Sequence, residues 1–225
     1  MWAVSSDPVK FDEALAYWRA RVPLTKKEFD ALTAAAKTRA FTLAGVAQLD
    51  VITEVMQAIE RALDEGTGIE QFRADIGAKL EAAWGATNPG RIDLIFRNAV
   101  QRSYSAGRYA QMTDPQVLKA RPYWRFDAVL DSRTSPICKP LNGTTLPADS
   151  TWWESHYPPL HHHCRSGVYS ITADQAQELG LTEGEPDISA GAGFGAAPGS
   201  ASDWEPSEDD YPADLWKAYE KKGGP

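Results

Sequence analysis

The sequence predicts an α+β protein with a mainly helical N-terminal body, a small mixed β-hairpin and loop-rich unit centred on cysteine and histidine, and a flexible C-terminal tail. Apolar residues recur at helical spacing as far as about residue 115. Beyond it, apolar and polar residues alternate as in strands, and turn sequences separate these stretches. Beyond residue 185, glycine, alanine, serine and proline prevail, and such a composition builds no core. We therefore predict a helical body at 1–115, a Cys/His unit at 116–185, a linker at 186–202 and an acidic aromatic tail at 203–225.

The composition is that of a globular protein with an acidic surface. Of its 225 residues, 43% are hydrophobic, which is enough for one main core. The formal net charge of -8 argues against nonspecific DNA binding by the whole chain, because phosphate contacts need a surplus of Lys and Arg. There is no signal-peptide pattern and no apolar run of about 18 residues, so we expect no membrane association.

The N-terminal body contains apolar residues at helical spacing. Predicted helices with a buried face cover residues 11–22, 29–63 and 69–84. Pro23 ends the first of them, and Gly45 is a kink or break in the second. Thr25 stands three residues before Glu28, which is the spacing of a capping box at a helix start.

A long basic helix is predicted over 91–112. Its exposed face would carry Arg91, Arg97, Arg102 and Arg108. A run of arginines usually forms a solvated face, and the alternative is contact with nucleic acid or an acidic partner.

The elements that follow are short. We predict strands at 122–130 and 166–171, a hairpin at 141–146 and a helix at 173–179. The hairpin prediction depends on Asn142-Gly143 between apolar flanks. Ser170 or Thr172 would cap the helix, which would end at Gly180.

Cysteine and histidine residues from separate loops are expected to meet within this unit. The predicted metal ligands are Cys138, His161, Cys164, Asp131 and His163. Zinc takes four such ligands in a tetrahedron, and a closed site can replace missing core in a small unit. His156 is a further candidate.

Other uses of these residues remain open. The cysteines could be buried without metal, or could form a Cys138–Cys164 disulfide. A catalytic Cys/His pair would need an oxyanion hole, and neither a helix start after Cys138 nor a glycine-rich turn is evident. A zinc-dependent hydrolase would use His161, His163 and Asp131, with Glu154 as the general base.

The C-terminal tail combines aromatic and acidic residues around a short predicted helix at 215–221. Its candidate partner-binding residues are Trp204, Tyr211, Leu215, Trp216 and Tyr219. A tethered helix of this kind docks either on its own chain or into the groove of a partner.

Several short motifs occur in a fixed order between residues 10 and 182. They are KTRAFT (37–42), ALDEG (62–66), RSYSAGR (102–108), RPYW (121–124), DSRTSPIC (131–138), LNG (141–143), WW (152–153) and PPLHHHCR (158–165). This succession resembles the phage Mu F-like head morphogenesis family, whose relatives include the minor head protein of phage SPP1.

The resemblance implies a minor, non-enzymatic virion protein made with the procapsid. Members of the family act in head assembly near the portal vertex, in few copies, and some associate with the packaged DNA. The implied partners are the portal protein or the major capsid protein, with the packaged DNA as a further one. The implied location is the virion head, or the host cytoplasm during assembly.

The resemblance also bears on the metal ligands. Many members have a further cysteine three residues before the position of Cys138 and another two residues after that of Cys164. Ser135 and Ser166 occupy these positions here, so Asp131 or another histidine would have to complete a site. Of the three consecutive histidines, His161 matches the family position.

Overall fold

The computed structural model describes residues 11–32, 40–192, 194–198 and 217. These residues form two compact units, a helical unit of residues 18–93 and a sheet unit of residues 11–17 and 94–198. Helices α1 (Asp12–Arg19) and α6 (Pro89–Met112) contribute residues to both units. The α+β class is confirmed, but the boundary predicted at residue 115 is wrong, because the second half of α6 belongs to the sheet unit.

The helical unit is built around α4 (Leu49–Glu65) and α5 (Ile69–Trp84). The apolar residues on their facing sides are buried, and they include Ile52, Val55, Ile59, Phe72, Ile76 and Leu80. The prediction of a helix at 69–84 is confirmed, since Gly85 ends α5 with a φ of 68°. The helical periodicity is therefore reliable where no competing strand intervenes.

The prediction of one helix over 29–63 is wrong. Strand β2 (Ala40–Phe41) pairs in parallel with β1 (Val22–Pro23), and Gly45 then turns the chain with a φ of 70°. The same pairing explains why α1 ends at Arg19 rather than at residue 22. The capping box of Thr25 and Glu28 is confirmed, at the start of α2 (Lys26–Asp30).

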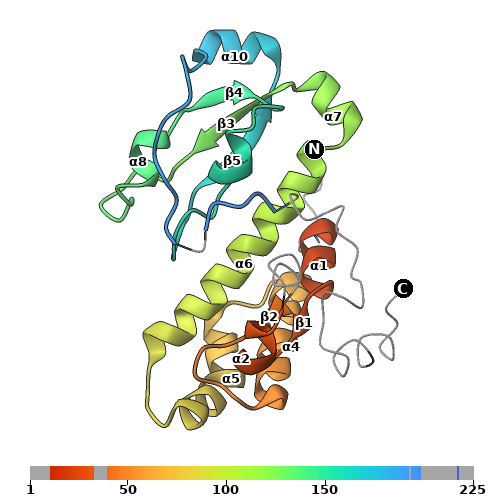
Figure 1. The fold of residues 1–225 in the computed structure, drawn as a ribbon, viewed down its shortest axis with the longest axis vertical. Helices are drawn as coiled ribbons and strands as arrows, with labels where there is room; N and C mark the ends of the chain where they lie inside the picture. The colour runs from red at the N-terminus through yellow and green to blue at the C-terminus, as the bar shows by residue number, and fades with distance from the viewer. Residues whose placement is uncertain (1–10, 33–39, 193, 199–216, 218–225) are drawn as a thin grey trace, which may run out of the picture. The chain divides into compact units, whose positions relative to one another are not determined.

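The sheet unit contains a three-stranded antiparallel sheet. Its strands are β3 (Tyr123–Asp127), β4 (Thr145–Pro147) and β5 (Gly167–Ile171), and their order is β4-β3-β5 (Figure 1). Trp124 pairs with Leu146 on one side and with Ser170 on the other. Both strands predicted in this unit are confirmed, with shorter bounds.

Short helices connect and flank these strands. They are α7 (Pro115–Ala120), α8 (Cys138–Leu141), α9 (Trp153–His156) and α10 (Ala173–Leu179). Thr172 caps α10 in a capping box with Gln175, as predicted. The hairpin predicted at 141–146 is wrong, because Asn142-Gly143 forms the turn between α8 and β4, with a φ of 84° at Gly143.

Aromatic residues fill the core of the sheet unit. Trp124 and Phe126 project from β3 and are buried, and Tyr157 and Tyr109 contact Trp124 edge to face. Trp153 completes the cluster, with its ring centroid 5.7 Å from that of Trp124. The alternation of residues along β3 thus separates a buried face from an exposed one.

Residues 186–192 and 194–198, which we call the strap, pack against this unit. The indole N–H of Trp152 donates to the carbonyl of Pro186, and the N–H of Gly191 donates to the carbonyl of Leu160. Ala197 is buried. The prediction of a flexible linker is therefore wrong for the described part of the strap, because its backbone groups find partners in the sheet unit.

The predicted partner-binding residues Trp204, Tyr211, Leu215, Trp216 and Tyr219 lie outside the described residues. Across the part of the chain that the structure describes, no helix combines the length and apolar character that a membrane span needs.

Candidate metal centre

Two segments of the sheet unit bring three ligand atoms together. Cys138 opens α8, and His161 and Cys164 lie in the turn that precedes β5. The two Sγ atoms and one imidazole nitrogen of these residues lie within 4.8 Å of one another. The structure thus unites three of the five predicted metal ligands.

The imidazole of His161 presents Nε2 to the cysteines. Its Nδ1 lies 2.7 Å from the carbonyl oxygen of His162, which can only accept a hydrogen bond. Nδ1 therefore carries the proton, and in the neutral ring the lone pair of Nε2 faces Cys138 Sγ at 3.2 Å.

Ser135 adds an oxygen to this cluster. Its Oγ lies 2.8 Å from His161 Nε2 and accepts a hydrogen bond from the backbone N–H of Cys138 at 3.0 Å. Ser166 is buried, and its hydroxyl opposes the rise in the pKa of the Cys138 thiol. Ser135 and Ser166 therefore both lie at the cluster.

The two thiols are buried and coupled. Cys138 is 2% exposed and Cys164 is 4% exposed, and their Sγ atoms are 3.8 Å apart. The S–H of Cys138 donates to Cys164, which lowers the pKa of Cys164 to about 5 against the opposing effect of burial. The same hydrogen bond, with burial, raises the pKa of Cys138.

Asp131 does not join the cluster. Its carboxylate accepts two hydrogen bonds from the guanidinium of Arg165, at 2.6 and 2.8 Å, and one from the backbone N–H of Arg133. These contacts, led by Arg165, lower the pKa of Asp131 well below its usual range. The prediction of Asp131 as a ligand is therefore not met by the geometry, because an ion pair already occupies its oxygens.

The remaining histidines also stay outside the cluster. His163 is exposed, has a φ of 57°, and donates its backbone N–H to the side chain of Asn98. The same asparagine hydrogen-bonds the ring of His162. His156 stacks on Trp152 with 4.2 Å between ring centroids, and its Nε2 donates to the carbonyl of Ile188 in the strap.

The zinc-dependent hydrolase alternative lacks a carboxylate base at the cluster. No carboxylate joins the cluster within the described ranges. Glu154, the nominated general base, is an exposed residue of α9 whose backbone carbonyl accepts from Ala197. A helix does start at Cys138, contrary to expectation, but it comprises only the four residues of α8.

Comparison with known proteins places these residues in a family. The model for phage Mu protein F like proteins matches residues 53–169, just over half of the chain, and this range includes the whole cluster. The chain is 34% identical to the putative capsid assembly protein F of Escherichia phage Mu, in an alignment of 200 residues that covers 81% of this chain. The chain belongs to the phage Mu F-like family.

A second Mu F-like relative is the FluMu F protein of a Mu-like prophage of Haemophilus influenzae. It is 31% identical over 159 residues, 65% of this chain. The match covers 44% of the phage Mu protein and 38% of the FluMu protein, so the chain spans less than half the length of these relatives. No solved structure matches the chain.

The four arginines of α6 in this Mu F-like chain do not share one face. At 100° per residue, residues eleven apart differ by only about 20°, so Arg91 aligns with Arg102, and Arg97 aligns with Arg108. The two pairs are separated by about 120°. The single arginine face that the sequence suggested is therefore wrong.

The environments of these arginines also differ. Arg91, in the helical unit, stacks over Trp84 at 4.2 Å and donates to the carbonyl of Ala44. In the sheet unit Arg97, Arg102 and Arg108 are exposed.

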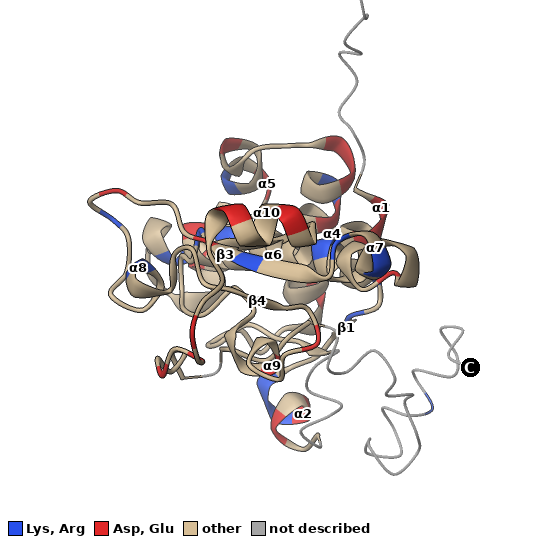
Figure 2. Cartoon of the chain, turned by 90° about the horizontal axis from the view of Figure 1, so that it is seen from above, with Lys and Arg blue, Asp and Glu red and all other residues tan. Residues whose placement is uncertain are grey.

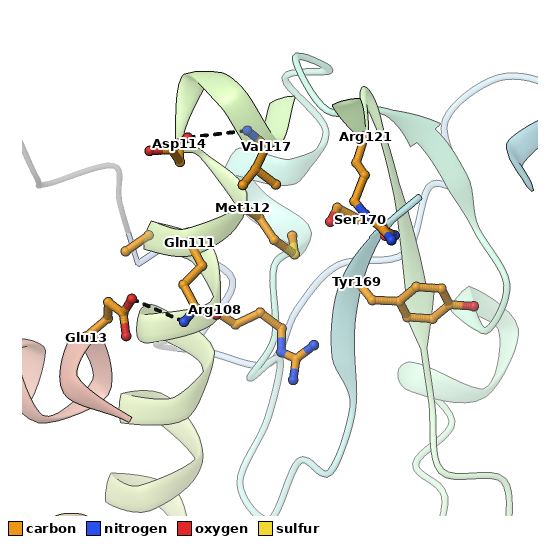
Figure 3. A pocket seen from close by; sticks show the side chains of 10 residues that line it. Glu13, Arg108, Gln111, Met112, Asp114, Val117, Arg121, Tyr169 and Ser170 are labelled. Atoms are coloured by element: carbon orange, nitrogen blue, oxygen red, sulfur yellow. Dashed lines mark hydrogen bonds between the residues drawn. The ribbon is translucent and has the colours of Figure 1, made fainter. Parts of the chain in front are cut away.

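A cleft of about 760 Å³ opens beside the last of these arginines (Figure 3). Arg108 and Arg121 line it together with Glu13 and Asp114, so its charges balance. Arg121 is already engaged, since it donates to the carbonyl of Ser170 at 2.9 Å. The cleft therefore favours neither an anion nor a cation.

Sequence reasoning missed the contacts that support the cluster. Asn98 and Gln101 lie on α6, and the latter donates to the carbonyl of Ser166 at 2.9 Å. The signal available in the sequence was that Asn98 and Gln101, two uncharged polar residues, lie about one turn apart on the same helix. Ser135 was singled out from the sequence only as the residue in place of a further cysteine, although a position three residues before Cys138 has the spacing of paired zinc ligands.

Proposed function

We propose that this Mu F-like chain is a minor head protein that takes part in assembling a phage head or a phage-derived particle. The observation that carries the proposal is its 34% identity, over 81% of its length, to the capsid assembly protein F of phage Mu. Its site of action would be the head, in contact with the portal protein or the major capsid protein. During assembly it would reside in the host cytoplasm.

The chemistry of the candidate centre supports a structural role rather than an enzymatic one. Its two thiols are buried, and within the described residues no carboxylate stands beside them to act as a base. A buried ligand set with no general base stabilises loops rather than activating a substrate.

The tail at 203–225 is our candidate for the contact with a head partner. Five of its residues are large and apolar or aromatic, among acidic neighbours. Deleting residues 203–225 should abolish incorporation into heads while the truncated chain keeps its thermal unfolding midpoint. Undiminished incorporation would remove the tail from the proposal.

Contact with packaged DNA is a second candidate function, limited to Arg97 and Arg108. Both are exposed on one side of α6. The charged side chains of α10 are all acidic (Figure 2), so a contact with DNA would not extend over this helix. A local contact of this kind is compatible with a role in head assembly.

Depletion in the encoding phage or prophage tests the main proposal. With an amber codon in the gene and no suppressor, electron microscopy of lysates should show a loss of normal DNA-filled heads, and suppression should restore them. Normal numbers of filled, infectious heads without the protein would contradict a role in assembly.

A further inference from the structure

The spacing of the cluster atoms fits a metal ion better than it fits a disulfide. In a tetrahedral zinc site with bonds of about 2.3 Å to sulfur, two sulfurs lie about 3.8 Å apart. Cys138 Sγ and Cys164 Sγ are 3.8 Å apart, whereas a disulfide holds its sulfurs at about 2.05 Å. In the same tetrahedral geometry a sulfur and a nitrogen ligand lie about 3.5 Å apart. Cys138 Sγ and His161 Nε2 are 3.2 Å apart, and a small side-chain rotation would remove this difference.

The orientation of His161 is already that of a ligand. A metal-bound histidine usually donates its other ring N–H to a carbonyl or carboxylate, which fixes the tautomer. Here the carbonyl of His162 takes that hydrogen bond at 2.7 Å. The lone pair of Nε2 consequently points into the cluster without any rearrangement of the ring.

Charge and softness select the ion. Two buried thiolates without a counter-charge would be costly, but a divalent cation cancels both of their charges. Two sulfurs and one imidazole are soft to borderline ligands, which suit zinc and exclude magnesium and calcium. No other group of three or more His, Cys, Asp or Glu residues in the described ranges has this spacing.

We propose that Cys138, His161 and Cys164 bind one zinc ion, and that an oxygen at the position of Ser135 completes the tetrahedron. Ser135 Oγ lies on the partly exposed side of the cluster, 2.8 Å from His161 Nε2. It either binds the ion or hydrogen-bonds a water that does. The site uses three cysteine and histidine ligands with one oxygen, and does not need Asp131.

The ion would add to the contacts that already join two segments, the Asp131–Arg165 ion pair among them. It ties the start of α8 to the turn at 161–164, and Gly191 in the strap donates a hydrogen bond to the carbonyl of Leu160, the residue before that turn. Zinc would thus stabilise the loops of the sheet unit where the three-stranded sheet does not reach.

Metal content and cobalt spectroscopy of the full 225-residue chain test the proposal. The purified protein should hold one zinc per chain, and cobalt in its place should show thiolate-to-metal absorption with the intense visible bands of a tetrahedral site. Cys138→Ser and His161→Ala should each weaken cobalt binding by more than the roughly 10- to 100-fold that loss of an outer-shell partner costs. His163→Ala and Asp131→Asn are matched controls and should leave binding unchanged.

A gain-of-function variant keeps the test decisive even if the loss variants fold poorly. Ser135→Cys should tighten metal binding and increase the thiolate-to-cobalt absorption per bound ion, because a third thiolate enters the site. Ser189→Cys adds an exposed thiol in the strap and should do neither.

Three results would overturn the proposal. The first is a chain that binds no zinc or cobalt in reducing buffer. The second is equal metal binding by the wild type and the Cys138→Ser and His161→Ala variants. The third is a Cys138–Cys164 disulfide, found by thiol counting, in protein that takes up no cobalt after reduction.

Discussion

Asp131 and Arg165 form a two-point ion pair, with N–O distances of 2.6 and 2.8 Å, that joins the loop before α8 to the residue after Cys164. The sequence suggested Asp131 as a metal ligand because it lies close to Cys138 along the chain. The ion pair instead holds the carboxylate of Asp131 outside the candidate centre. Asp131 therefore joins the same two segments as the cluster of Cys138, His161 and Cys164, through a separate contact.

This pair predicts a pH dependence of stability. Arg165 lowers the pKa of Asp131 in the folded state, so the carboxylate contributes stability above its unfolded pKa of about 3.9, and that contribution is lost as the pH falls through the folded value. Wild-type protein should therefore exceed Asp131→Asn in free energy of unfolding above about pH 4, and the difference should shrink below it. Urea unfolding in the presence of chelator measures this without the metal, and a difference that grows with acid would contradict the assignment.

The hydroxyl of Tyr157 is a weak point of the core. Its side chain is 1% exposed, and its oxygen has no hydrogen-bond partner among the described residues. Tyr157→Phe removes a buried polar group that has no partner, so the free energy of unfolding should rise by about 1 kcal/mol. Tyr123→Phe, at a half-buried site, should change it by less than about 0.5 kcal/mol, and a clear loss of stability in Tyr157→Phe would show that the hydroxyl has a partner.

Close packing of α1 against α6 within the sheet unit depends on Gly107. A Cβ at this position would lie 2.6 Å from the backbone nitrogen of Ala14 and 2.9 Å from the ring of Phe11. Although glycine to alanine usually stabilises a helix, Gly107→Ala should lower the free energy of unfolding by about 1 to 3 kcal/mol. Gly90→Ala, whose added Cβ would have no neighbour closer than 4.0 Å, should not lower it, and equal effects in both variants would refute the close approach.

The sequence predicted the elements whose signals are local. The periodicity of 69–84, the capping box at Thr25, the helix cap expected at Ser170 or Thr172 and the alternation along β3 all depend on residues within one element. The structure confirms each of them, with Thr172 as the cap. Residue type and loop position likewise predicted that Cys138, His161 and Cys164 would meet, and the structure brings these three of the five candidate ligands together.

The errors arose where distant segments meet. The residues around Ala40 and Phe41 have a composition that favours helix, but pairing with Val22 and Pro23 makes these two residues a strand. Nothing in the glycine-rich strap reveals that Trp152, His156 and Leu160 would bind its backbone. Side-chain partners such as Arg165 for Asp131 also depend on the fold.

The exposed Arg97 and Arg108 are our candidates for a local electrostatic contact with DNA. Because they align on α6, the double variant Arg97→Glu, Arg108→Glu should weaken binding and reduce the slope of log affinity against log salt by about 2. The matched control is Lys119→Glu, Lys139→Glu, which changes the net charge equally at exposed residues of α7 and α8. Equal losses in both double variants would mean that overall charge, and not this side of α6, governs binding.

Quantitative mass spectrometry of purified procapsids and virions tests whether this chain is a minor head protein. The chain should be present in both particles, in a small and constant number relative to the major capsid protein. Absence of the chain from both particles, with heads that assemble normally, would contradict its assignment as a head protein.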